Sequence, residues 1–321
     1  MIGALDERPG TRSLITAAGA APSVHNTQPW RFGVGDDGLV VLYPDLERRL
    51  TVVDPRGRSL HISCGAALLN LRLALRVAGY DPVTWLLPHS EEPVAPLAVV
   101  RPVPSVPPSP AERALYEAIA VRRTNRRPFS GCLVPHPILE ELVRAARREG
   151  ADLSILEPVE DDPLLWWVGA SERRLRAEPD YRAELDRWTT ATPREDGIPF
   201  AAFGPTGGRT LARDFSGSGD AGVSGEQVAR WEERPQFALL GTRTDGPYGW
   251  LRAGQALQRV LLTAALHGVS ASFLNQPLDL RDMRGRGRAG RTRHLQMIIR
   301  LGYGTPSPPT PRRPVSDLLT S

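Results

Sequence analysis

Two long helical patterns in this chain match each other, and no other feature constrains the fold as much. Each is apolar on nearly every side, which is typical of a helix buried on all faces, and each precedes a strand-like run, at residues 83–87 and 270–274. The matching positions, at a constant offset, are Gly65, Ala67, Leu68, Leu73 and Gly79 in the first pattern and Gly254, Ala256, Leu257, Leu262 and Gly268 in the second. A weaker match relates residues 14–18 to residues 142–146. Either two alanine- and leucine-rich helices are alike by coincidence, or the chain contains a duplication with two similar lobes around a shared core.

A proline-rich segment separates the two patterns. Residues 99–110 read VVRPVPSVPPSP, and prolines at this density predict an extended linker rather than a helix or a central strand. We therefore expect a first half over residues 1–105 and a second half over residues 106–321. A hairpin is expected at residues 30–43, and the further alternation of short strands and amphipathic helices predicts an α/β or α+β fold.

One long region of the second half has no counterpart in the first. Residues 160–235 begin with a charged amphipathic helical pattern over residues 164–188 and continue with sequence rich in glycine and proline. Insertions of this kind are typically lids or disordered loops. Residues 217–222, GSGDAG, match a glycine-rich dinucleotide signature, but no strand pattern precedes them, so we expect no dinucleotide there.

The composition excludes several classes of chemistry. All 40 basic residues are arginine, so mechanisms that need a lysine amine are excluded, and arginine or backbone N–H groups must bind anions. The cysteines and histidines form no zinc-binding pattern, and we expect no metal. The net charge of +4 is too small for a dedicated nucleic-acid binder. We expect neither a signal peptide nor a membrane span, which predicts a cytoplasmic protein.

Three segments contain side chains suited to a polar or anionic ligand. Residues 21–30, APSVHNTQPW, suit a ligand with hydroxyls and ring amides, or form a helix-capping loop. Residues 121–129, VRRTNRRPF, contain four arginines that match phosphate geometry or form a solvated basic turn. Residues 310–314, TPRRP, hold two arginines between prolines, as an anion anchor or as a solvated tail.

Taken together, these segments resemble the flavin-dependent nitroreductase superfamily. APSVHNTQPWRF is similar to the family's PSxxNxQPW segment, RRTNRRPF to its RRSxRxF segment, which binds the flavin phosphate, and LGYGTPSPPTPRRPVSDLL to its last strand and basic tail. The order of the first two is reversed here, since NTQPW precedes the linker and RRTNRRPF follows it. The chain is therefore similar to the fused, Acg-type subgroup, in which one chain imitates the family's homodimer and one complete flavin site survives.

The resemblance implies an α+β, nitroreductase-like fold of two related lobes, with a lid-like insertion at about residues 160–235. It also implies FMN as the cofactor and NAD(P)H as the reductant. The implied cofactor-binding residues are Arg122, Arg123, Thr124, Arg126, Arg312, Arg313, Pro22, Ser23, Val24, Asn26, Gln28, Leu274, Asn275 and Gln276. The last three lie where the family offers backbone N–H groups to flavin N5, although the usual glycine-rich sequence is absent. Four aromatic residues of the insertion either face a substrate or pack the lid onto the core: Tyr181, Trp188, Phe200 and Phe203.

The implied function is that of an FMN-dependent NAD(P)H oxidoreductase. Hydride transfer through the flavin would reduce a nitroaromatic, quinone or enone in ping-pong order, without a catalytic residue from the protein. One alternative is an FMN-sequestering stress protein with a lidded flavin and little turnover, and another is a dedicated biosynthetic flavin oxidoreductase. The expected partner is a small-molecule electron acceptor, with no nucleic acid and no membrane. We expect a monomer, because a fused pseudo-dimer already buries its own interface.

Overall fold

The first half forms one antiparallel sheet with its helices on the inner face. The computed structural model describes residues 9–35, 38–89, 94–160, 162–190, 194–203, 232–284 and 293–320. The elements of this half are α1 (Pro9–Gly19), β1 (Trp30–Val34), β2 (Val40–Pro44), α2 (Arg58–Val77), β3 (Tyr80–Leu86) and β4 (Ala98–Pro104). The strand order is β1-β2-β4-β3, with every pair antiparallel. The expected hairpin is β1 with β2.

The second half repeats this arrangement. The elements that correspond to those of the first half are α4 (His136–Arg148), β5 (Asp152–Ile155), β8 (Gln236–Thr242), α7 (Pro247–Leu266), β9 (Ser270–Phe273) and β10 (His294–Gly302). Helix, two strands, helix and two strands follow one another as in the first half, and the strand order β5-β8-β10-β9 is equivalent. The long matched patterns are α2 and α7, and the weaker match relates α1 to α4. This repeat favours duplication over coincidence, and the halves at residues 1–105 and 106–321 are our proposed division.

The prediction of an extended linker at residues 99–110 is wrong over its first part, because β4 is an interior strand. Its pairing explains how the prolines are tolerated. β2 pairs with β4 only at residues 98–100, whereas Pro102 and Pro104 pair with β3 alone. These prolines therefore lie where β4 has a neighbour on one side only, and a missing N–H group can face away from the sheet. α3 (Pro110–Val121) follows, and begins with a capping box between Ser109 and Glu112.

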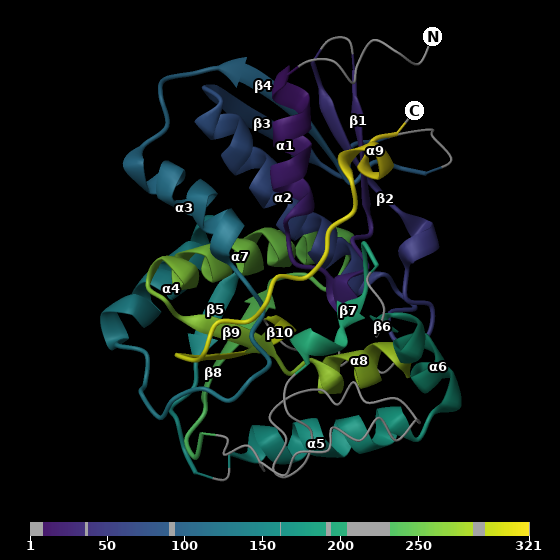
Figure 1. Ribbon diagram of the computed structural model, residues 1–321, viewed down its shortest axis with the longest axis vertical. Coiled ribbons are helices and arrows are strands. Elements are labelled where there is room, and N and C mark those ends of the chain that lie inside the picture. Colours follow the sequence, from purple (N-terminus) through teal and green to yellow (C-terminus); the bar gives the residue numbers. More distant parts are fainter. Residues whose placement is uncertain are drawn as a thin grey trace.

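The two central helices, α2 and α7, cross each other (Figure 1), and glycines lie at their contact. A Cβ atom on Gly65 would lie 2.3 Å from the carbonyl oxygen of Leu251, and one on Gly254 would lie 2.0 Å from that of Ile62. Neither position accepts a side chain. These are the first matched positions of the internal repeat, so the sequence similarity marks the contact between the halves. α2 is apolar and long enough to span a membrane, but 78% of its most apolar stretch is buried inside the protein, as expected for a core helix.

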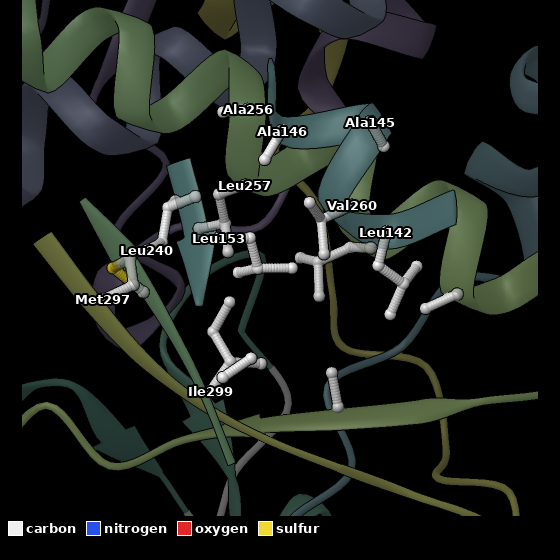
Figure 2. Close-up of a cluster of buried hydrophobic side chains, with 14 of the residues drawn as sticks. Leu142, Ala145, Ala146, Leu153, Leu240, Ala256, Leu257, Val260, Met297 and Ile299 are labelled. Carbon is white, nitrogen blue, oxygen red and sulfur yellow. The ribbon is translucent and has the colours of Figure 1, made fainter. Parts of the chain in front are cut away.

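The core of the second half lies between its sheet and two helices. Leu142 and Ala146 of α4 and Leu257 and Val260 of α7 pack onto one face of the sheet (Figure 2). Successive residues of a strand point to opposite faces, so β8 also presents residues to the other face of the sheet. There it packs with α5 (Pro163–Arg176) and α8 (Gln276–Met283).

The insertion contains two helices where one was expected. α5 ends at Arg176 and α6 (Pro179–Arg187) begins at a proline, which cannot continue a preceding helix because it lacks the N–H group. Two short parallel strands follow, β6 (Thr189–Thr190) and β7 (Ile198–Pro199). Residues 204–231 of the insertion, with the glycine-rich sequence at 217–222, lie outside the described residues. Three 3-10 turns cover Val24–Asn26, Leu46–Arg48 and Phe200–Ala202.

The C-terminal tail connects the second half to the first (Figure 1, yellow). After β10 it crosses to the first sheet, where α9 (Val315–Leu318) packs against α1 and β1. Leu318 is buried in the core of the first half, and the Thr320 N–H donates to the carbonyl oxygen of Phe32 at 2.9 Å. The tail is therefore anchored to the first half at its C-terminal end and to the second half through β10.

Candidate functional site

The loop at residues 21–29, between α1 and β1, has an unusual backbone. His25, Asn26 and Gln28 have φ angles of 46°, 55° and 49°, in the left-handed region that non-glycine residues rarely adopt. Such strain persists only where the surroundings hold it, and it is common at functional sites. Here the Ser23 hydroxyl accepts a hydrogen bond from the Gln28 N–H at 2.9 Å, and the Ser63 hydroxyl of α2 accepts one from Val24 at 3.2 Å.

Asn26 connects this loop to the insertion and to the tail. Its side-chain amide donates to the carbonyl oxygens of Gly197 at 2.9 Å and Pro311 at 3.1 Å. Its side-chain oxygen accepts a hydrogen bond from Arg312 at 3.1 Å. Segments far apart in sequence thus meet at one buried amide, which places the Arg312 guanidinium beside the loop.

Gln28 and Arg313 form a second buried connection. The Gln28 side-chain oxygen accepts from the Arg313 N–H at 2.9 Å, and its amide donates to the Glu195 carbonyl oxygen at 2.9 Å. The Arg313 guanidinium pairs with Asp45 at 3.1 Å. Neither Gln28 nor Arg313 lines the cavities described below, so the structure places both behind the site, and their predicted contact with a cofactor stays a prediction.

The predicted arginine segment and the tail meet at a small basic cavity. The segment follows α3 and is fixed to the second sheet, where the Asn125 N–H donates to the Ala271 carbonyl oxygen at 2.9 Å. The cavity has an empty volume of about 390 Å³, which includes space open to solvent. Its lining residues are Pro22, Ser23, Asn26, Arg122, Arg123, Thr124, Arg126, Ile198, Pro308, Thr310 and Arg312. The cavity thus brings together residues from all three segments that the sequence singles out.

Buried guanidinium groups give this cavity a strong positive charge. Arg122 is only 4% exposed, and its Nε and Nη1 atoms have no hydrogen-bond partner among the described residues. Burial, with Arg312, Arg123 and Arg126 nearby, lowers the pKa of Arg122 to about 9. Burial, with Arg123, lowers the pKa of Arg312 to about 10. Buried, crowded cations with unused N–H donors are complementary to a multiply charged anion.

A larger and more apolar cavity adjoins the basic one. The two share Pro22, Ser23, Thr124 and Arg126 in their walls. The larger cavity has an empty volume of about 870 Å³, which includes space open to solvent. Its other lining residues are Val24, His25, Ser59, Ile62, Ser63, Leu257, Ser272, Phe273, Asn275, Asp279 and Met297. Both halves of the chain contribute, and the volume suits a ligand with an aromatic ring.

Several of these lining residues carry no signal in the sequence. Ser59, Ile62 and Ser63 lie on α2 and Leu257 on α7, where the sequence shows only the pattern of a buried helix. These residues line the cavity because of how the two halves pack together. A short sequence motif contains no information about that packing. The internal repeat was the available signal, because it identified the two helices that meet at the site.

The predicted segment 274–276 is only partly exposed to the cavity. Asn275 lines it, and its side-chain oxygen accepts from the Ile298 N–H at 2.9 Å. Leu274 and Gln276 are fully buried and line neither cavity. Contact between the backbone of these residues and a cofactor stays a prediction.

None of the four aromatic residues of the insertion lines either cavity. Tyr181 is buried in a small core with Leu50 and Val53, and Trp188 and Phe203 pack against it. Phe200 is exposed and contacts Phe203, with ring centroids 5.2 Å apart. The insertion does reach the basic cavity elsewhere, through Ile198. Whether the aromatic residues meet a substrate stays a prediction.

Comparison with known proteins decides the family. One relative from Mycobacterium tuberculosis, named "Putative NAD(P)H nitroreductase", is 33% identical over 318 residues, which cover 96% of this chain and 90% of the relative. The chain belongs to the nitroreductase family. A second nitroreductase relative from the same organism, named "Putative NAD(P)H nitroreductase acg", is 30% identical over 96% of this chain and 94% of its own length. The expected α+β fold of two related lobes is confirmed.

Comparisons with solved structures and with family models say less about this chain. A solved nitroreductase with bound FMN from Desulfitobacterium hafniense is 13% identical and covers 65% of this chain and 97% of its own, with a TM-score of 0.38. No family model matches the chain. Among the described residues, no group of histidine, cysteine and carboxylate side chains could hold a metal ion.

Proposed function

We propose that this nitroreductase-family chain is an FMN-dependent NAD(P)H oxidoreductase. The observation that carries the proposal is the pair of adjoining cavities, one basic and one apolar, built by both halves. FMN combines a phosphate, a hydroxylated chain and an aromatic ring. The basic cavity matches the phosphate, Ser23 and Thr124 at the shared wall match the hydroxyls, and the apolar cavity matches the ring. The names of the relatives agree with NAD(P)H as the reductant.

The residues present fit the phosphate of this cofactor. A buried guanidinium with unused donors is costly unless an anion completes it, and Arg122 is in this situation within the described part of the chain. Arg122, Arg123 and Arg312 would hold the phosphate, with Asn26 fixing the position of Arg312.

The chain's own residues bind and orient, and none needs to act as a nucleophile. Bound FMN supplies the hydride transfer between the reductant and the acceptor. Ile62, Leu257 and Met297 exclude water from the apolar cavity, and Asn275 is held in the wall by its bond to Ile298. The acceptor would be a nitroaromatic, a quinone or an enone that enters after the oxidised nicotinamide leaves.

One such site per chain is the expected number. The loop at residues 21–29 supplies five of the residues that line the two cavities, including Asn26 and Val24. In the second half, α4 ends at Arg148 and β5 begins at Asp152, so the equivalent connection is too short to form such a loop. The chain would therefore act as a monomeric pseudo-dimer. We place it in the cytoplasm, as the sequence suggests.

A flavin-sequestering protein with little turnover is the second candidate. It is favoured by the insertion, because Ile198 lines the basic cavity and the carbonyl oxygen of Ala202 accepts a hydrogen bond from Arg126 at 3.4 Å. A flavin covered in this way would be less accessible to a nicotinamide.

An anaerobic titration of the purified protein separates the candidates. The protein should show a yellow flavin chromophore that NADPH or NADH bleaches within seconds and a quinone or nitroaromatic restores. Bleaching by dithionite but by neither nicotinamide would favour sequestration. A colourless protein that takes up no added FMN would contradict both candidates.

A further inference from the structure

The C-terminal tail occupies the space between α1 and the outer edge of β1. β1 is an edge strand of the first sheet, and Leu319 forms a parallel bridge with Phe32 there. Leu318 is buried among the core residues of the first half, and a Cβ atom added to Gly19 of α1 would lie 2.8 Å from the Leu318 Cδ1 atom. A short apolar segment thus covers both the edge of the sheet and the adjoining helix.

The second half has an equivalent position without an equivalent tail. α4 corresponds to α1, and β5 corresponds to β1 as an edge strand of its sheet. Among the described strands, β5 pairs with β8 alone. β10 continues into the tail, whereas its counterpart β4 continues into α3, so the first half supplies no tail to β5.

A groove lies at this position, between α4 and the end of β5. The α4–β5 groove has an empty volume of about 1270 Å³, which includes space open to solvent. Its walls include Leu133, Leu139, Val143, Arg147, Ile155 and Leu156. It shares no lining residue with the two cavities of the candidate site, so an inference about it does not rest on the proposed function.

The internal repeat shows that apolar residues of this groove lack the cover that their counterparts have. At the offset that relates α1 to α4, Val143 stands at the position of Ile15. Ile15 is fully buried in the core that contains Leu318, whereas Val143 is partly exposed in the wall of the groove. Leu133, in the same groove, is 47% exposed. Covering such side chains is favourable, and the outer edge of an edge strand is a template for pairing with another chain.

The groove differs from its counterpart in charge. Arg147 stands at the position of Gly19, and it forms no ion pair with another described residue. The neighbouring Arg144 pairs with Glu140 at 3.4 Å, and Glu157 lies on the β5 side. The α4 wall therefore favours a ligand that places a carboxylate near Arg147.

We propose that the α4–β5 groove is a docking site for an extended segment of a partner protein that combines apolar residues with a carboxylate. The backbone of this segment pairs with the outer edge of β5, as in other cases of strand addition. Its apolar side chains cover Val143 and Leu133, and its carboxylate pairs with Arg147. Residues 315–320 of the tail, VSDLLT, show the kind of sequence that the equivalent position in the first half accepts.

A synthetic peptide with the sequence of residues 314–321, PVSDLLTS, is the probe, since it carries the required apolar residues and carboxylates. The peptide is acetylated at its N-terminus and titrated calorimetrically into the full-length, flavin-loaded protein. The chain's own tail keeps its position on β1, because its attachment gives it a high effective concentration there. We expect one peptide bound per chain, with a Kd below about 1 mM.

Charge and apolar contact are tested separately. A peptide with Asp317→Lys and an amidated C-terminus should bind at least about 10-fold more weakly, from the lost attraction to Arg147. Arg147→Glu should weaken binding of the original peptide by a similar factor, and Leu133→Ser should weaken it by removing apolar contact. Arg148→Glu is the matched control, because Arg148 is the next exposed arginine of α4 and does not line the groove, and it should change nothing.

Each other outcome overturns the proposal. Absence of peptide binding at about 1 mM means that the groove is no docking site of this kind. Binding that Arg147→Glu and Leu133→Ser leave unchanged places the peptide elsewhere. Dimerisation of the protein that Arg147→Glu abolishes would assign the groove to a second copy of the chain. The comparison of the two peptides on the wild-type protein does not depend on the folding of any variant.

Discussion

At the scale of single residues, the site is defined by arginines that differ in what surrounds them. Arg122 has buried donors without partners among the described residues, whereas Arg313 is paired with Asp45 behind the site. The sequence identified both arginines as candidates, but it could not show which of them is already paired. That depends on partners far away in the chain. Sequence reasoning selected segments that line the two cavities, and it missed Ser59, Ser63 and Asp279, which reach the larger cavity only through the packing of α2 and α8.

Arg122→Ala should weaken FMN binding by roughly 10- to 100-fold, which corresponds to about 1.5–3 kcal/mol for a hydrogen bond to a charged group. Riboflavin, which lacks the phosphate, should bind the variant and the wild-type protein equally well. Arg113→Ala, on the exposed side of α3, is the control and should leave both affinities unchanged. Equal loss of FMN and riboflavin affinity would show that Arg122 supports the fold rather than the phosphate.

At the scale of elements, the crossing of α2 and α7 at Gly65 and Gly254 explains the internal repeat. The matched glycines could be read from the sequence, but their mutual contact could not. The expected linker was wrong for a different reason. The number of prolines predicts how a segment behaves on average. Whether β4 accepts a given proline depends on whether that residue pairs with a strand on both sides.

Gly65→Ala should destabilise the protein by about 1–3 kcal/mol, since the new methyl group overlaps the Leu251 backbone in a crossing that cannot widen without separating the halves. Gly10→Ala, in α1, has open space around its Cβ and should be neutral or slightly stabilising. Chemical denaturation of the two variants measures the difference. Similar free energies of unfolding would contradict the tight crossing.

The start of α2 should make stability depend on pH. Asp54 accepts hydrogen bonds from the N–H groups of Ser59 and Leu60, yet burial raises its pKa from the ordinary 3.8 to about 7. The native state therefore favours the protonated form, and the stability from this group is present below pH 3.8 and is lost as the pH rises through 7.

The free energy of unfolding should accordingly fall between pH 5 and pH 7, with a contribution from Asp54 that approaches about 1.4 kcal/mol per pH unit. Asp54→Asn, which resembles the protonated acid, should flatten this part of the profile. Urea unfolding at a series of pH values provides the measurement, and parallel profiles for the two proteins would exclude Asp54 as the source.

At the scale of the whole molecule, the α2–α7 crossing and the C-terminal tail both join the two halves. The tail carries Arg312 to the basic cavity and buries Leu318 in the first core. The family resemblance predicted that the halves complete one site, and the shared lining of the cavities agrees with it. The sequence could not show that the insertion and the tail meet at Asn26, since these contacts join residues far apart in the chain.

Leu318→Ala should cost about 2–5 kcal/mol of stability, as expected for a fully buried leucine. It should also weaken FMN binding, because the tail that holds Arg312 loses its anchor. Leu266→Ala, an exposed position at the end of α7, serves as the comparison and should affect neither property. Loss of stability with unchanged FMN affinity would show that Asn26 alone is sufficient to hold Arg312.

The number of FMN molecules bound per chain tests the central claim most directly. The protein is reconstituted with excess FMN, freed of unbound cofactor, and analysed for flavin and protein concentration together with the molecular mass in solution. A composite site shared by two halves predicts one FMN per 321-residue monomer. Two FMN molecules per chain, or none, would contradict a single site built jointly by both halves.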